Sequence, residues 1–231
     1  MSDNTRVYNQ DCMIGMKEFP DKHFDLAIVD PPYGLDEDSH RQNERRSNLA
    51  KSKRYHDSVW RQSAPDEDYF RELHRISKNM IVWGANHFIS FCPLDSPCWI
   101  VWDKDNGEND FADCELAWTS FNTAVRQLRF MWSGFCQGKS FKEGHINQGN
   151  KSLCEPRMHP TQKPVALYKW LLKNYAKEGD KILDTHLGSQ SSRIAAFDMG
   201  FDFTGYELDE SYFIAGCKRF EQFKSQLKIF A

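Results

Sequence analysis

The chain has 231 residues, 40% hydrophobic and 27% charged, which is typical of a globular protein large enough for one substantial α/β core. No apolar run approaches the roughly 20 residues of a bilayer span, and the N-terminus lacks a secretory signal, so we expect a cytoplasmic protein without a membrane segment. The net charge of -3 excludes a strongly basic nucleic-acid binder, so any DNA contact must come from a local group of basic side chains.

The cysteines and histidines give no sign of a disulfide framework or a metal site. The seven cysteines are scattered and never form a Cys-x-x-Cys pair, which fits reduced thiols that serve mainly in packing. The eight histidines do not stand at ligand spacing beside them, so we expect no metal.

The first part of the chain predicts short strands and helices followed by a long loop. Residues 5–8 favour a strand, and residues 13–19 a helix that Pro20 ends. Residues 26–29 form a continuous apolar run, typical of a strand covered on both faces. Residues 36–65 are polar and predict a mobile loop. Its basic side chains are Arg41, Arg45, Arg46, Lys51, Lys53, Arg54 and Arg61.

The middle of the chain predicts a helix and several strands. Asp66 is a candidate N-cap for a helix over residues 69–76, which leads to an apolar strand over residues 80–83. Three further strands are expected in the segment that follows, ending the sheet with antiparallel partners, and then a second loop rich in Gly, Lys and Asn. These strands span residues 98–102, 116–118 and 125–132, and the loop spans residues 133–157.

The last part alternates regularly between helices and strands, over residues 165–175, 181–183, 191–199 and 201–206, with a long helix from Asp209. Such alternation predicts a single α/β domain over residues 1–231, a doubly wound and mostly parallel sheet. Ligands of such sheets bind beyond the C-terminal ends of the strands, so the residues that follow each strand are the candidates for chemistry.

Asp30-Pro31-Pro32-Tyr33 directly follows the apolar strand at residues 26–29. Two prolines stiffen the chain and remove two backbone donors. The Asp30 carboxylate and the Pro31 carbonyl can then accept both hydrogens of an exocyclic amine. Tyr33 offers a ring on which a base removed from the duplex can stack. The alternative for an isolated Pro-Pro turn is a rigid strand end without a ligand.

Two more strand ends suit a nucleotide-like ligand. Asp184 to Ser191 is a strand end, a turn of small residues and a helix start, where backbone amides are open to a ligand. Glu207 ends the next strand, at the place from which such folds bind ribose hydroxyls. Residues 159–164 open the helix before the Asp184 strand, and their spacing alone demands no ligand.

In this order, Asp-Pro-Pro-Tyr, His-Pro-Thr-Gln-Lys-Pro, Asp-x-x-x-Gly-Ser and a strand that ends in Glu resemble the DNA adenine-N6/cytosine-N4 methyltransferase family. More narrowly they resemble its circularly permuted beta class, over about residues 5–213. The resemblance implies an S-adenosylmethionine-dependent, Rossmann-like domain with a seven-stranded sheet. It also implies action on double-stranded DNA, as in restriction-modification systems. Small stand-alone enzymes that this chain resembles are often encoded by prophages, and no partner nuclease is evident. Whether the protein forms a homodimer is left open.

The resemblance also assigns roles to residues. Asp30, Pro31, Pro32 and Tyr33 match the catalytic tetrad. Positions expected to contact the cofactor are Asp11, Cys12, Thr161, Lys163, Asp184, His186, Gly188, Ser189, Gln190 and Glu207. Sequence recognition falls to residues 36–65 and 133–157, with Arg41, Arg45, Arg46, Lys51, Lys53 and Arg54 as the expected DNA contacts.

This chain departs from the family loop Asp-Pro-Phe-x-Gly-x-Gly at Thr185, His186 and Gln190. We expect Gln190 to place a side chain where close backbone approach is usual. Asp at the first tetrad position favours adenine over cytosine. The alternatives are an N4-cytosine enzyme, a methyltransferase for protein or ribosomal RNA amines, and a catalytically weak protein that binds DNA or the cofactor.

Overall fold

A computed structural model describes residues 3–34, 64–92, 95–107, 112–133, 136–159 and 161–229. The basic residues expected to contact DNA, from Arg41 to Arg54, lie outside these ranges.

The described strands confirm the predicted order of elements. They are β1 (Thr5–Asn9), β2 (Phe24–Val29), β3 (Ser77–Trp83), β4 (Trp99–Asp103), β5 (Cys114–Thr119), β6 (Arg126–Arg129), β7 (Trp132–Ser133), β8 (Cys136–Gln137), β9 (Lys181–Asp184) and β10 (Asp202–Glu207). The helices are α1 (Cys12–Met16), α3 (Glu67–Ile76), α4 (Val165–Tyr175), α5 (Ser191–Asp198) and α6 (Glu210–Ile229), with short 3-10 helices η2 (Ala85–His87) and η3 (Lys151–Leu153).

The main sheet is mostly parallel, and its strand order is β1-β10-β9-β2-β3-β5-β4-β6. Among the described strands of this sheet, only β5 runs against its neighbours, β3 and β4. Outward from β9 the sheet continues with β10 and then β1, and outward from β2 it continues with β3. The change of direction between β9 and β2 is where an open α/β sheet forms its ligand crevice.

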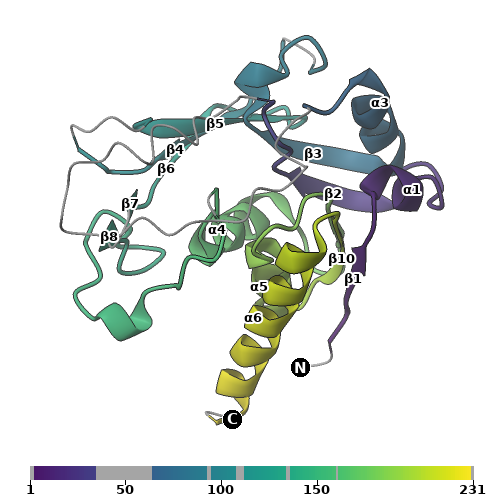
Figure 1. Cartoon of the computed structure of the whole chain (residues 1–231). Helices are drawn as coiled ribbons and strands as arrows, with labels where there is room; N and C mark the ends of the chain where they lie inside the picture. The colour runs from purple at the N-terminus through teal and green to yellow at the C-terminus, as the bar shows by residue number, and fades with distance from the viewer. Residues whose placement is uncertain are drawn as a thin grey trace.

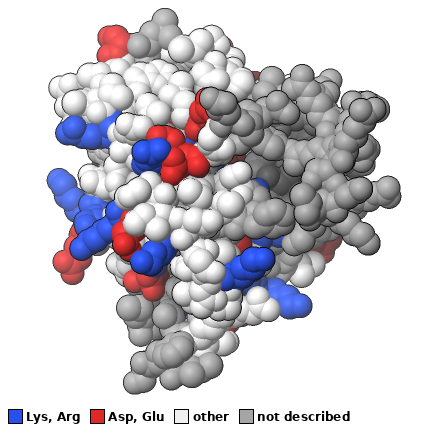
Figure 2. Space-filling model, turned by 90° about the vertical axis from the view of Figure 1, so that its left-hand side faces the viewer, with Lys and Arg blue, Asp and Glu red and all other residues white. Residues whose placement is uncertain are grey.

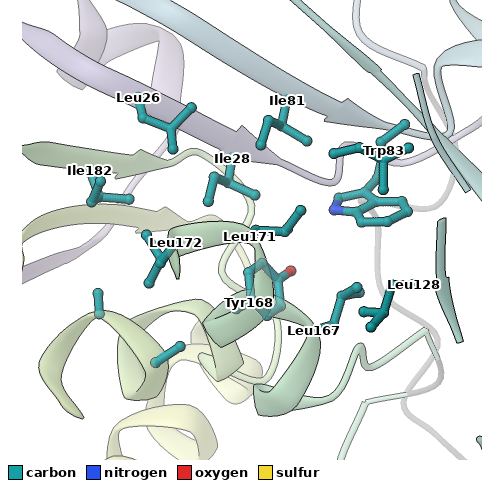
Figure 3. Close-up of a cluster of buried hydrophobic side chains, with 14 of the residues drawn as sticks. Leu26, Ile28, Ile81, Trp83, Leu128, Leu167, Tyr168, Leu171, Leu172 and Ile182 are labelled. Atoms are coloured by element: carbon teal, nitrogen blue, oxygen red, sulfur yellow. The ribbon is translucent and has the colours of Figure 1, made fainter. Parts of the chain in front are cut away.

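Helices cover both faces of the sheet (Figure 1). The side chains of α4 and α5 pack on one face, and those of α1 and α3 on the other. Alternation along β2 explains both layers, because Leu26 and Ile28 join the first core while Ala27 and Val29 join the second. Figure 3 shows Leu26, Ile28, Ile81 and Trp83 above the buried side chains of α4. The continuous apolar run of β2 is thus covered on both faces, as predicted.

Local capping confirms one helix start and explains another. The Asp66 carboxylate accepts the Tyr69 N–H at 3.0 Å and begins α3, as expected for an N-cap. At α4, Pro164 offers no side-chain acceptor, and the Glu155 carboxylate accepts the Val165 N–H at 3.0 Å instead. Arg219 of α6 contacts the same carboxylate at 2.9 Å, so the start of α4 is fixed from two sides.

The structure corrects four expectations. The sheet has eight strands among the described residues rather than seven, because β6 adds to the edge beside β4. The single strand expected over residues 125–132 is broken after Arg129: the Met131 N–H bonds to Gly144 O, and the chain leaves the sheet to form the β7–β8 hairpin. Residues 133–157 are therefore not wholly loop, since they include β8 and η3, and α1 ends at Met16 rather than Phe19.

In the part of the chain that the structure describes, no helix combines the length and the apolar character needed to cross a membrane.

Candidate active site

The Asp30 carboxylate stands at the end of β2, next to the crevice between β2 and β9. Pro31 is buried behind it, which fixes the chain as it leaves the strand. The Tyr33 hydroxyl donates a hydrogen bond to Asp30 Oδ1 at 2.9 Å. The first and last members of the predicted tetrad are therefore in direct contact, and the Asp30 side chain is still 15% exposed.

Lys163 reaches the same carboxylate from the segment before α4. Its Nζ lies 2.5 Å from Asp30 Oδ2 and 3.1 Å from Glu115 Oε2 of β5. It also donates to the Tyr33 hydroxyl at 3.5 Å. The structure thus places Lys163, expected beside the cofactor, on the Asp30 carboxylate.

The Tyr33 ring is held by η2 and the turn before it. It stacks on the His87 ring with centroids 4.8 Å apart and 17° between planes. Gly84 has a φ of +66°, and a Cβ there would stand 2.0 Å from Tyr33 Cε1. A glycine is therefore required on two counts, since the backbone is left-handed and the ring lies against it.

Asp184, at the end of β9, is almost completely buried, with 1% exposed. Its Oδ2 accepts the Ser192 hydroxyl at 2.5 Å, and its Oδ1 accepts the His186 N–H at 3.0 Å. Burial raises the pKa of Asp184 to about 7, and the nearby charges of Asp30 and Glu207 add to the rise. The carboxylates that end or follow the neighbouring strands β2, β9 and β10 therefore act on one another across a single crevice.

Thr185 and His186 stand where the family loop has Pro and Phe, and a chain of hydrogen bonds holds them. The Tyr69 hydroxyl of α3 lies 2.7 Å from Thr185 Oγ1, which lies 2.9 Å from His186 Nδ1. Burial lowers the pKa of His186 to about 4, so its ring is neutral at pH 7. Polar contacts here replace the packing that Pro and Phe give in the family loop.

Gln190 has a φ of +59°, which explains why a glycine is usual at this position. Its side chain is fully buried and turns to α6, where Nε2 donates to Phe213 O at 3.3 Å. Arg193 donates to its Oε1 at 3.0 Å. A Cβ at Gly216 would stand 2.7 Å from Gln190 Cγ, so that glycine makes the room. The Gln190 side chain therefore packs between α5 and α6.

Glu207 connects the ends of β10 and β9. Its Oε2 accepts the Gly188 N–H at 2.7 Å, and its Oε1 accepts the Asp209 N–H at 2.9 Å. Gly188 has a φ of +48°, a left-handed conformation that aims its amide at Glu207. Burial raises the pKa of Glu207. Each carboxylate oxygen can accept a second hydrogen bond, so both remain able to bind hydroxyl groups.

The other expected cofactor positions follow β1 or lie in the turns that precede α4 and α5. Asp11 caps α1 by accepting the Met13 N–H at 2.8 Å, and Cys12 behind it is buried. The two residues follow β1, whose Asn9 pairs with Glu207 and donates to its carbonyl at 2.8 Å. Ser189 lies 3.0 Å from Ser191, oxygen to oxygen, while the exposed Thr161 hydroxyl lies 3.1 Å from His159 Nδ1. Thr161 thus contacts its own turn.

Sequence reasoning missed Glu115 and His87, both of which contact tetrad or tetrad-bound groups. Neither belongs to a motif, and each is brought in by the pairing of β3, β5 and β4. The one signal available in the sequence was the position of Glu115 next to a predicted strand. The structure then places it opposite Trp102 in the antiparallel pair of β4 and β5.

Comparisons with known proteins identify the family of this chain. A family of DNA methylases that act at N6 or N4 matches residues 99–216, about half of the 231 residues. The type II methyltransferase M.HinfI of Haemophilus influenzae is 23% identical over 254 aligned positions, covering 94% of this chain and 68% of the relative.

Two solved structures share the fold. The M1.HpyAVI–SAM complex has a TM-score of 0.57 and 18% identity, covering 93% of this chain and 99% of the other. The cytosine-N4-specific PvuII DNA methyltransferase has a TM-score of 0.56 and 13% identity, covering 97% and 92%. With its Asp-Pro-Pro-Tyr turn at the crevice of a mostly parallel sheet and the match over residues 99–216, the chain belongs to the N6/N4 DNA methyltransferase family.

Proposed function

We propose that this protein transfers a methyl group from S-adenosylmethionine to the exocyclic N6 of an adenine flipped out of duplex DNA. The observation that carries the proposal is the Asp30 carboxylate. It stands at the end of β2 in contact with Tyr33, at the point where the sheet changes winding direction. Catalysis on a base inside a duplex also requires that the base leave the stack.

The tetrad fits an amine substrate. The Asp30 carboxylate and the Pro31 carbonyl accept the two amine hydrogens, which leaves the nitrogen lone pair free to attack. With the cofactor bound, the new nitrogen–carbon bond would form as the methyl carbon–sulfur bond breaks, and the Asp30 carboxylate would stabilise the positive charge on the nitrogen until a proton leaves it. Tyr33 stacks the base, so the chain contributes mainly by positioning and by removing water.

The crevice fits S-adenosylmethionine by its charge. Asp30, Asp184 and Glu207 surround it on neighbouring strands, and their mutual repulsion supports the raised pKa of Asp184. A sulfonium cation relieves such repulsion. Glu207 would bind the ribose, Asp11 and Cys12 the adenine, and the loop from Asp184 to Gln190 the methionine end. When bound, the group supplies the methyl electrophile. M1.HpyAVI, of similar fold, is a complex with SAM.

DNA must be gripped by a local set of basic residues. On the face shown in Figure 2, Lys and Arg stand beside Asp and Glu in the described part, without a continuous patch of one sign. Pairs such as Lys139–Glu143 and Arg129–Asp105 account for part of this mixture. Their basic side chains make residues 36–65 the proposed main DNA contact, and residues 133–157 are the second candidate.

Adenine is proposed on the Asp of the tetrad, and cytosine N4 is the alternative, because the PvuII enzyme with a similar fold is cytosine-N4-specific. The test is to incubate the protein with methyl-labelled S-adenosylmethionine and unmethylated duplex DNA, and then to digest the DNA to nucleosides. Label in N6-methyl-2′-deoxyadenosine supports the proposal, and label in N4-methyl-2′-deoxycytidine replaces it by the alternative. Cofactor and DNA binding without label in either nucleoside points to a catalytically weak binding protein.

A further inference from the structure

A line of alternating charges crosses the site and ends on the catalytic carboxylate. Lys104 Nζ lies 2.7 Å from Glu115 Oε1, and Lys163 Nζ lies 3.1 Å from Glu115 Oε2 and 2.5 Å from Asp30 Oδ2. The four residues come from four separate places in the chain: the end of β4, β5, the entry to α4 and the end of β2.

Lys163 is unusual because it is buried and shared. Its side chain is 3% exposed, it faces two carboxylates, and it lies 5.5 Å from the centroid of the Trp83 ring. Removing an ammonium from water costs free energy that a buried ion pair often fails to recover, so a well-packed apolar residue would serve stability as well. A buried charge at this position therefore points to a role in the site.

The geometry shows what that role is. The two oxygens of Asp30 are held by donors from different elements, Oδ1 by the Tyr33 hydroxyl and Oδ2 by Lys163. Together they fix the plane of the carboxylate. Oδ1 keeps a free lone pair for an amine hydrogen, because a carboxylate oxygen accepts two hydrogen bonds.

We propose that Lys163, braced by Glu115, is a positioning residue for methyl transfer that fixes the Asp30 carboxylate as acceptor for the target amine. The proposal rests on the proposed function of the site. It gives Lys163 a different partner from the cofactor contact that the sequence resemblance implies, and the two roles predict different kinetic effects.

The charges around Asp30 give the proposal a pH signature. Burial raises the pKa of Asp30, the Lys163 charge opposes that rise, and the Glu115 charge adds to it. Lys163 itself stays protonated because Asp30 and Glu115 raise its pKa, whereas Lys163 and Lys104 lower the pKa of Glu115 to about 2. The remaining titratable groups that act on Asp30 or feel its charge are Tyr33, Tyr69, Tyr168 and Asp184.

Asp30 accepts a hydrogen bond from the amine only when ionised, so methylation falls as the pH drops through its pKa. Lys163→Met removes an opposite charge, so the acid limb of the pH–rate profile should move to higher pH, by about 1 to 3 units. Glu115→Gln removes a like charge, so the limb should move to lower pH, while the rate at neutral pH still falls because Lys163 loses its brace. A purely structural role predicts no such opposite movement.

The experiment measures single-turnover methylation of duplex DNA against pH for wild type, Lys163→Met, Lys163→Arg and Glu115→Gln. Lys169→Met is the matched control. Lys169 of α4 also pairs with a carboxylate, since its Nζ lies 2.5 Å from Asp198 Oδ2, but this pair does not include the tetrad. Calorimetry gives the S-adenosylmethionine affinity of each variant. Carbon-13 NMR titration of the Asp30 carboxyl in the free protein gives its pKa without any turnover.

Lys163→Met should lower the rate at saturating cofactor by about tenfold to a hundredfold, the scale of a misplaced catalytic group, with cofactor affinity unchanged within twofold. Lys163→Arg keeps the positive charge, so the acid limb of its pH–rate profile should lie close to that of the wild type. The control should match wild type. An Asp30 titration that stays in place in Lys163→Met, or a loss confined to cofactor affinity, overturns the proposal. If wild type methylates no DNA, the proposed function fails, and the Asp30 titration still decides whether Lys163 controls that carboxylate.

Discussion

Gly84→Ala tests whether the position of the Tyr33 ring matters for methylation. The new Cβ would stand 2.0 Å from Cε1 and 2.4 Å from Cζ of Tyr33. Carbon atoms in contact keep about 3.5 to 4.0 Å, so the ring must shift by roughly 1.5 Å or the backbone must move. The atoms that clash belong to the far end of a side chain, so we expect the ring to give way and break its stacking on His87.

The magnitude follows from two separable costs. A left-handed φ costs a residue with a Cβ about 1 to 2 kcal/mol, which lowers stability. Displacing the ring costs the stacking of the base, worth about 1 to 3 kcal/mol, or roughly 5- to 150-fold in kcat/KM for DNA. Gly179→Ala is the matched control, because Gly179 has a φ of +86° and no described atom lies within 4 Å of its Cβ position.

The assay compares thermal unfolding and methylation kinetics for both variants. Similar losses of stability in the two, with a loss of kcat/KM for DNA only in Gly84→Ala, agree with stacking on Tyr33. Equal activity of the two variants would refute the role of the ring. Tyr33→Phe removes the hydroxyl and keeps the ring. Activity retained in this variant separates stacking on the ring from the hydrogen bond to Asp30.

Three further predictions concern the crevice and the DNA contact. Glu207→Gln should weaken S-adenosylmethionine binding by calorimetry, by about 1.5 to 3 kcal/mol for a charged hydrogen bond to ribose, with DNA affinity retained; unchanged cofactor affinity contradicts the assignment. The pKa of Asp184 is raised to about 7 in the fold and is near 4 in the unfolded chain, so its contribution to stability is lost as pH rises from about 4 to 7. Asp184→Asn should flatten that part of the pH dependence in chemical denaturation, and an unaltered slope contradicts the assignment. Neutralising the basic residues of residues 36–65 together should reduce the log–log salt dependence of DNA affinity by about 0.9 for each phosphate that the protein no longer binds, and an unchanged slope moves the DNA-binding surface to residues 133–157. The residues to change are Arg45, Arg46, Lys53 and Arg54.

Much of the fold follows from local sequence patterns. The apolar run of β2, the helical spacing of α3 and the Asp66 cap are each properties of a few adjacent residues, and the structure confirms all three. The break after Arg129 was missed because apolar and aromatic residues that favour a strand recur up to Trp132, and the competing bond from the Met131 N–H to Gly144 O joins distant segments. Tertiary contacts of this kind override local strand propensity.

The site was predictable where its residues share a motif and not where they meet only in space. The tetrad is contiguous, and its first and last members are in contact. Lys163 and Asp30 are 133 positions apart, so their pairing depends on how α4 docks beside β2. The direction of the Gln190 side chain likewise depends on Gly216, in a helix that local sequence patterns cannot place beside it.

The central claim is that the Asp30 carboxylate directs methyl transfer to a base amine. The most direct measurement is methyl incorporation into duplex DNA by wild type and by Asp30→Ala, each at saturating S-adenosylmethionine and with folding checked by thermal unfolding. The claim predicts labelled methyl-base with wild type, and none above background with a folded Asp30→Ala that still binds the cofactor. Incorporation by Asp30→Ala within a few-fold of wild type would contradict it.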